Sequence, residues 1–190
     1  MLVLGGCGGT KTQDENEPEG NFPLEVVDAS FPGEQKLAKR SDLRITVRNA
    51  GSETVPNVAV TVNGLTQRRD DPDLADPERP IFVINGVQTD IGGLPEAKEA
   101  APRGCDTAYV NTWACGPLRP GRERTFRWSV TAVEAGDYTV SYRVAAGLDG
   151  KARAIPSSGR LTGNFRGTIS DEAPDTRVAD DGKTIIRGTR

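Results

Sequence analysis

Apolar and polar residues alternate with a period of two in several short segments, and this pattern predicts β-strands. In residues 42–48, Leu43, Ile45 and Val47 fall on one side and polar residues fall on the other. A period of two places alternate side chains on opposite faces of a strand, so this segment is expected to be half-buried. Other segments of β-type composition are residues 24–31, 58–63, 81–84, 125–133, 138–144 and 151–155.

Turn residues separate these segments. Asn49-Ala50-Gly51 follows the second one, and Asp181-Gly182 lies between apolar residues near the C-terminus, where it predicts a terminal hairpin. Residues 64–80 have no apolar period and are expected to form a surface loop. Residues 94–101, with a proline in the first turn and another just beyond, favour a short helix.

Composition agrees with an all-β chain. Only 35% of the 190 residues are apolar, but 22 are Gly and 13 are Pro. Many short strands separated by Gly and Pro are typical of a sandwich or barrel. No run of about 18 apolar residues is present, which argues against a membrane-spanning helix.

Two motifs resemble immunoglobulin-like domains. Gly136-Asp137-Tyr138 followed by Tyr142 resembles the start of strand F, where a Tyr turns its hydroxyl back to the preceding corner, and Val140 stands where antibody domains have a Cys. The strand over 43–48, the Asn49-Ala50-Gly51 turn and the valines of 55–60 resemble bacterial CARDB-type domains. The resemblance covers about residues 24–63 and 121–155.

It implies an immunoglobulin-like antiparallel β-sandwich over residues 23–190. A long loop insertion at about 64–120 and a C-terminal hairpin extension at about 156–190 fall outside the match. Domains of this kind serve as spacers and interaction modules on bacterial surface proteins.

The N-terminal Leu4-Gly5-Gly6-Cys7 resembles a bacterial lipobox, in which the peptidase cuts before the Cys and the Cys carries the lipid. Only four uncharged residues precede Gly5, whereas a signal peptide has a charged region and about 7–15 apolar residues. Either translation starts further upstream, or this is a Gly-rich terminus with an incidental Cys. If the segment is a lipobox, the protein is expected to be extracytoplasmic and anchored to the membrane by lipid alone.

Residues 1–22 are expected to be a lipobox remnant and a disordered tether. The tether carries one Lys and four acidic residues, so its charge of −3 accounts for the whole net charge of the chain. The remaining body, residues 23–190, is therefore neutral overall and must recognise a partner through local patches.

The other two cysteines, Cys105 and Cys115, are expected to form a disulfide if the protein is exported, because such bonds persist outside the cytoplasm. In a cytosolic protein they would instead be reduced and buried.

The absence of His from the sequence excludes Ser-His-Asp triads, Cys-His dyads and HExxH zinc sites. No phosphate-binding loop is present, and the charge balance argues against nucleic-acid binding. We therefore predict no catalytic residue, no cofactor and no metal site. The acidic run over residues 70–78 offers oxygen ligands for Ca²⁺ but lacks EF-hand spacing, so a solvated loop is favoured.

Four residues are candidates for binding. Trp113 and Tyr109 lie within the expected disulfide loop, where they could stack on a sugar or anchor a partner. The small number of aromatic residues available for a core favours Trp113 as a plug at the end of the sandwich. Arg127 and Arg143 lie on the polar sides of two successive strands. Pairing of those strands would make a basic face for an acidic polymer or partner, or simply a face turned to water.

The sequence thus favours a non-enzymatic, lipid-anchored surface protein acting in interaction, adhesion or scaffolding, with an unknown protein or glycan at the cell surface as partner. A carbohydrate-binding module that uses Trp113 and Tyr109 is one alternative. A small enzyme that works through carboxylates is another.

Overall fold

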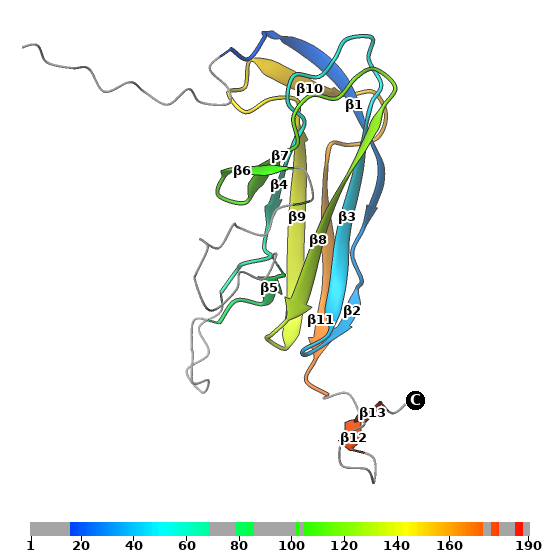
Figure 1. The fold of residues 1–190 in the computed structure, drawn as a ribbon, viewed down its shortest axis with the longest axis vertical. Coiled ribbons are helices and arrows are strands. Elements are labelled where there is room, and N and C mark those ends of the chain that lie inside the picture. Colours follow the sequence, from blue (N-terminus) through cyan, green and yellow to red (C-terminus); the bar gives the residue numbers. More distant parts are fainter. Residues whose placement is uncertain are drawn as a thin grey trace, which may run out of the picture.

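The computed structural model describes residues 16–68, 79–85, 102 and 105–172, and the backbone of 176–178 and 185–187. Over these residues the chain forms strands and no helix, arranged mainly in two sheets (Figure 1). The expected helix over 94–101, the acidic run over 70–78 and Cys7 lie outside the described residues.

The first sheet has five strands. Their order is β10 (Ala152–Pro156), β1 (Gly20–Ser30), β3 (Arg40–Asn49), β8 (Glu123–Ala132) and β5 (Phe82–Ile84). β1, β3, β8 and β5 are antiparallel neighbours, whereas β10 joins β1 in parallel.

The second sheet has six strands. Their order is β2 (Glu34–Lys36), β11 (Thr162–Ser170), β9 (Gly136–Ala145), β4 (Ala59–Asn63), β7 (Thr112–Ala114) and β6 (Asp106–Tyr109). All pairs are antiparallel except β2 with β11. The terminal hairpin expected around Asp181-Gly182 is also present, as β12 (Thr176–Val178) paired with β13 (Ile185–Arg187).

The strand order is that of an immunoglobulin-like sandwich. In chain order β1, β3, β4, β5, β8, β9 and β11 occupy the positions of strands A to G, because β1-β3-β8-β5 reproduces the order ABED and β11-β9-β4 reproduces GFC. The predicted fold class is confirmed, although two parallel pairs make the sheets mixed. Strands β5, β6 and β7 come from the expected insertion, and β11 comes from the expected C-terminal extension.

The core lies between the sheets and is built by the alternation seen in the sequence. The inner faces bury Leu43, Ile45 and Val47 from β3 against residues of β4, β8 and β9. Trp128 packs edge-to-face on Trp113 with the ring centroids 5.3 Å apart. Phe31, Phe82 and Tyr138 form a second aromatic group near the other end, with centroids 5.2–5.5 Å apart.

Tyr138 begins the F-like strand as expected, but its hydroxyl does not turn to the preceding corner. It donates to the carbonyl of Pro32, between β1 and β2, and accepts from Gln35 Nε2 at 3.1 Å. Burial raises the pKa of Tyr138, and the bond from Gln35 lowers it by less. Tyr138 thus ties the connection between β1 and β2 to β9, so the expected contact with the preceding corner is wrong.

The Asn49-Ala50-Gly51 turn is confirmed, and its Asn has a structural role. The Asn49 side chain is fully buried, and its Nδ2 donates to the carbonyls of Glu53 and Leu118, both at 2.8 Å. Its Oδ1 accepts from Gly51 N at 2.9 Å. All of these polar groups are satisfied, so the residue fixes where the chain leaves the first sheet for the second.

Candidate functional site

The structure separates the two arginines that the sequence had placed together. Arg127 lies on β8 in the first sheet and Arg143 lies on β9 in the second, and β8 and β9 do not pair. The connection over 133–135 carries the chain from one sheet to the other. Alternation shows that each strand has one apolar face, but it does not show whether two such faces share a sheet or oppose each other across a core. The expected common face of Arg127 and Arg143 is therefore wrong.

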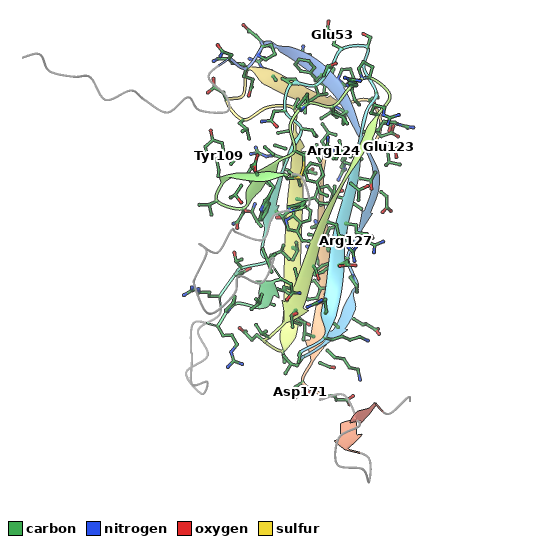
Figure 2. All side chains as sticks on the ribbon, viewed as in Figure 1. Glu53, Tyr109, Glu123, Arg124, Arg127 and Asp171 are labelled. Carbon is green, nitrogen blue, oxygen red and sulfur yellow. A yellow bond between two sulfur atoms is a disulfide. The ribbon has the colours of Figure 1, made fainter. Side chains whose placement is uncertain are left out.

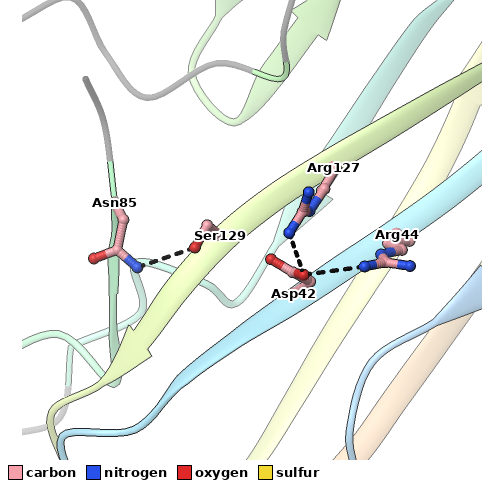
Figure 3. Close-up of polar contacts among 5 residues, drawn as sticks. All are labelled: Asp42, Arg44, Asn85, Arg127 and Ser129. Carbon is pink, nitrogen blue, oxygen red and sulfur yellow. Dashed lines mark hydrogen bonds and ion pairs between the residues drawn. The ribbon is translucent and has the colours of Figure 1, made fainter.

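On the outer face of the first sheet, the central arginines are paired with carboxylates. Asp42 accepts hydrogen bonds from Arg127 at 2.7 Å and from Arg44 at 3.2 Å (Figure 3). Arg44 and Arg127 are direct cross-strand partners, so the carboxylate lies beside two like charges. The bond from Arg127, aided by Arg44 against a smaller effect of burial, lowers the pKa of Asp42.

A second ion pair lies further along the same face. Both Nε and an Nη atom of Arg48 donate to Glu25 Oε2, and Ser158 Oγ donates to Oε1 at 2.8 Å. These contacts lower the pKa of Glu25, the bond from Arg48 most of all. The central arginines of this face thus already have carboxylate partners.

The outer face of the second sheet is different. Cross-strand register sets one row of residues across five strands, because directly opposite residues share a face. The row is Tyr109, Thr112, Thr61, Arg143 and Thr162. Oγ1 of Thr61 and Oγ1 of Thr112 are hydrogen-bonded at 2.9 Å. The next row holds Asn63, Ser141 and Asn164, and the row after that holds Thr139 and Arg166.

Arg143 and Arg166 have no ionic partner among the described residues. Neither side chain makes a hydrogen bond or ion pair with any residue that the structure describes, and both are exposed. They lie four residues apart along paired strands, which corresponds to about 13 Å. Asp137, further along β9, accepts from Thr168 Oγ1 at 2.7 Å. We call the residues of these three rows the threonine-arginine face.

The aromatic candidates separate as well. The Trp113 side chain is only 4% exposed and packs on Trp128, so it belongs to the core and offers little surface to a ligand. Tyr109 is 52% exposed on β6, well apart from Arg127 (Figure 2). Period-two alternation on the short hairpin explains this difference in exposure. Thr112 faces outward in the same row as Tyr109, and the next residue, Trp113, faces inward.

The expected disulfide joins Cys105 to Cys115. It closes the β6–β7 hairpin at its base, where Cys115 N donates to Val58 O at 3.0 Å and Arg124 donates to Cys115 O at 3.1 Å. The bridge therefore helps to hold Tyr109 and Thr112 at the edge of the second sheet.

Within the described ranges, no group of three or more His, Cys, Asp or Glu side chains is close enough to hold a metal ion. The same part of the chain contains no helix long and apolar enough to cross a membrane.

Arg166 was not predicted as a site residue, because β11 has little apolar signal in the sequence. Its inward positions include Gly163 and Gly167, where an added Cβ would lie 2.6 Å from the ring of Tyr142 and 2.0 Å from Gly33 O, respectively. The Tyr142 ring and the backbone carbonyl of Gly33 thus occupy the space of a side chain, and Gly stands where a strand pattern would show an apolar residue. Alternation of Thr162, Asn164, Arg166 and Thr168 was the available signal.

Comparison with known proteins is limited to fold. No protein-family model and no curated protein matches the sequence. The chain is similar to the crystal structure of the CARDB domain of PF1109 from Pyrococcus furiosus, in complex with di-metal ions, with 15% identity, 86% of this chain and 100% of that chain covered, and a TM-score of 0.43. It is also similar to the crystal structure of native alpha-2-macroglobulin from Escherichia coli, spanning domain MG7 to the C-terminus. The identity is 13%, the match covers 85% of this chain and 21% of that chain, and the TM-score is 0.44.

A third similar structure is the PapD-like domain 7 of human CEP192. The identity is 16%, the match covers 90% of this chain and 96% of that chain, and the TM-score is 0.37. CARDB domains, which the sequence motifs resemble, are thus among the solved structures similar to this chain. At these identities and TM-scores the similarity assigns no ligand, and the immunoglobulin-like architecture rests on the strand order itself.

Proposed function

We propose that this protein is a non-enzymatic interaction module, lipid-anchored through Cys7 on the extracytoplasmic side of a membrane, that binds an acidic cell-surface polymer through the threonine-arginine face. Adhesion or scaffolding at the cell surface would follow from that binding. The observation that carries the proposal is the pair Arg143 and Arg166, which lack a carboxylate partner among the described residues, whereas the central arginines of the opposite face are paired.

The chemistry of this face suits an acidic saccharide polymer. A guanidinium forms bidentate, charge-assisted hydrogen bonds with a carboxylate or sulfate. The hydroxyl and amide groups between the two arginines both donate and accept, which matches the hydroxyls of a sugar. The spacing of about 13 Å between the arginines favours a repeating ligand over a single small anion.

The burial of Trp113 argues against the alternative in which Trp113 and Tyr109 stack on a neutral sugar. Tyr109 remains in the face, at the end of the Arg143 row, where its ring can cover one flank of a bound chain.

Binding can be tested with polygalacturonate and heparin as carboxylated and sulfated probes. We expect the double variant Arg143→Ala, Arg166→Ala to bind at least about ten-fold more weakly, equivalent to about 1.4 kcal/mol. The matched control is Arg40→Ala, Arg153→Ala, which removes two exposed arginines of the first sheet that have no side-chain partner among the described residues. Equal loss in both variants, or binding of neither probe by the unaltered protein, would contradict the proposal.

The anchoring claim has a separate test. Mass spectrometry of the protein taken from the membranes of its native host should show an acylated N-terminal Cys7 and a Cys105–Cys115 bridge. An unmodified Cys7 would contradict the anchor, and three free thiols would contradict export as well.

A further inference from the structure

The side chain of Glu17 ties the acidic segment before β1 to the loop that connects β9 to β10. The carboxylate of Glu17 lies against residues 147–152, which connect β9 to β10. Its Oε2 accepts from the backbone N of Leu148 at 2.5 Å and of Asp149 at 2.9 Å, and its Oε1 accepts from Ala152 N at 2.7 Å.

Three N–H groups that converge on one carboxylate form an anion-binding nest. Such charge-assisted bonds are shorter and stronger than neutral ones. Partial burial alone would raise the pKa of Glu17, but the hydrogen bonds from the loop backbone outweigh it and lower the pKa below the usual value.

The loop is shaped around this carboxylate. A Cβ on Gly147 would lie 2.3 Å from both Cδ and Oε2 of Glu17, so only Gly leaves room for the bound group. Because the clash is with the end of a flexible side chain, an Ala there would displace the carboxylate without disturbing the core. The charged side chains around the nest are Asp149 and Lys151, which pair with each other at 2.7 Å, and Glu19 on the same segment as Glu17.

We propose that the 147–152 loop is a carboxylate-binding site, that Glu17 is its ligand in cis, and that acidic peptide segments compete with Glu17 for it. Docking of Glu17 ties residues 16–19 to this loop, and an acidic partner that displaces Glu17 releases them. The site is separate from the threonine-arginine face and does not depend on the lipid at Cys7.

The cis contact is tested by NMR on the full chain. In the unaltered protein the amide resonances of Leu148, Asp149 and Ala152 should shift together as the Glu17 carboxyl titrates, with a midpoint below that of an ordinary Glu. Glu17→Gln and Gly147→Ala should both abolish this titration and lower the heteronuclear NOE of residues 16–19. Glu19→Gln is the control with the same charge change on the same segment, and it should leave both signals unchanged.

Competition is tested with a peptide of residues 14–19. The peptide should shift the three amides in the Glu17→Gln chain, and should need at least a ten-fold higher concentration in the unaltered chain, where the cis ligand has a high effective concentration. It should have no effect in Gly147→Ala. Unchanged amides in Glu17→Gln would overturn the cis site. Loss of the cis signal without peptide binding would overturn the claim that acidic segments compete.

Discussion

The two outer faces of the sandwich are built from similar residue types and differ in how they treat charge. On the first sheet, Asp42 lies between Arg44 and Arg127, and Glu25 pairs with Arg48. On the second, Arg143 and Arg166 stand among Thr, Ser and Asn side chains with no ionic partner in the described part of the chain. Both faces are polar, so their hydropathy alone would not distinguish them.

The difference shows why net charge is a poor guide here. A body with equal numbers of acidic and basic groups has no overall field, yet pairing within one face leaves basic groups unpaired on the other. Exposed ion pairs add little to stability, so their main effect on the first face is to occupy its central arginines, Arg44, Arg48 and Arg127. This difference is why we propose the threonine-arginine face, and not the first sheet, as the binding surface.

The largest expected effect concerns the hairpin that extends the second sheet. Trp113→Ala should lower the free energy of unfolding by about 3–5 kcal/mol, because it empties a large buried site beside Trp128. Tyr109→Ala should change it by about 0.5 kcal/mol or less, since that side chain is half exposed. Urea denaturation followed by fluorescence measures both.

Binding should show the reverse order for the folded variants. Tyr109→Ala should weaken capture of polygalacturonate, and Trp113→Ala should affect it only through the unfolded fraction. If Tyr109→Ala unfolds the protein while Trp113→Ala does not, the assignment of core and surface on this hairpin is wrong.

A smaller effect tests whether ion pairs with Asp42 keep the arginines of the first face from binding an acidic ligand. Asp42→Asn removes the carboxylate between Arg44 and Arg127 and leaves two unpaired arginines opposite each other. We expect this variant to bind heparin a few-fold more tightly than the unaltered protein, by the same charge-assisted chemistry. No gain in affinity would show that unpaired arginines are not sufficient for recognition.

The same variant has a defined pH dependence. The folded pKa of Asp42 is lowered, so its stabilising effect is complete above the unfolded value of about 3.9 and is lost as pH falls through the folded value. Asp42→Asn should therefore be less stable than the unaltered protein at pH 7. The difference should shrink as pH falls below about 3.9 and vanish once the folded protein binds the proton at Asp42.

How far the sequence predicts this molecule depends on what each signal measures. The alternation of Leu43, Ile45 and Val47 reports burial on one face. The same kind of signal predicted β1, β3, β4, β5, β8, β9 and β10, and with the immunoglobulin-like motifs it gave the fold class. It says nothing about which strands pair, so it could not separate Arg127 from Arg143. The glycines of β11 hid Arg166, and the docking of Glu17 depends on backbone amides that leave no residue signature beyond Gly147.

The central claim is that the second sheet, and not the first, presents the binding surface. The most direct test is a titration of the ¹⁵N-labelled protein with an oligogalacturonate, followed through its amide resonances. The account predicts shifts at Thr61, Arg143 and Arg166 with their row neighbours, and none at Arg44, Thr46 or Arg127. Shifts concentrated on the first sheet, or spread evenly over both, would contradict it.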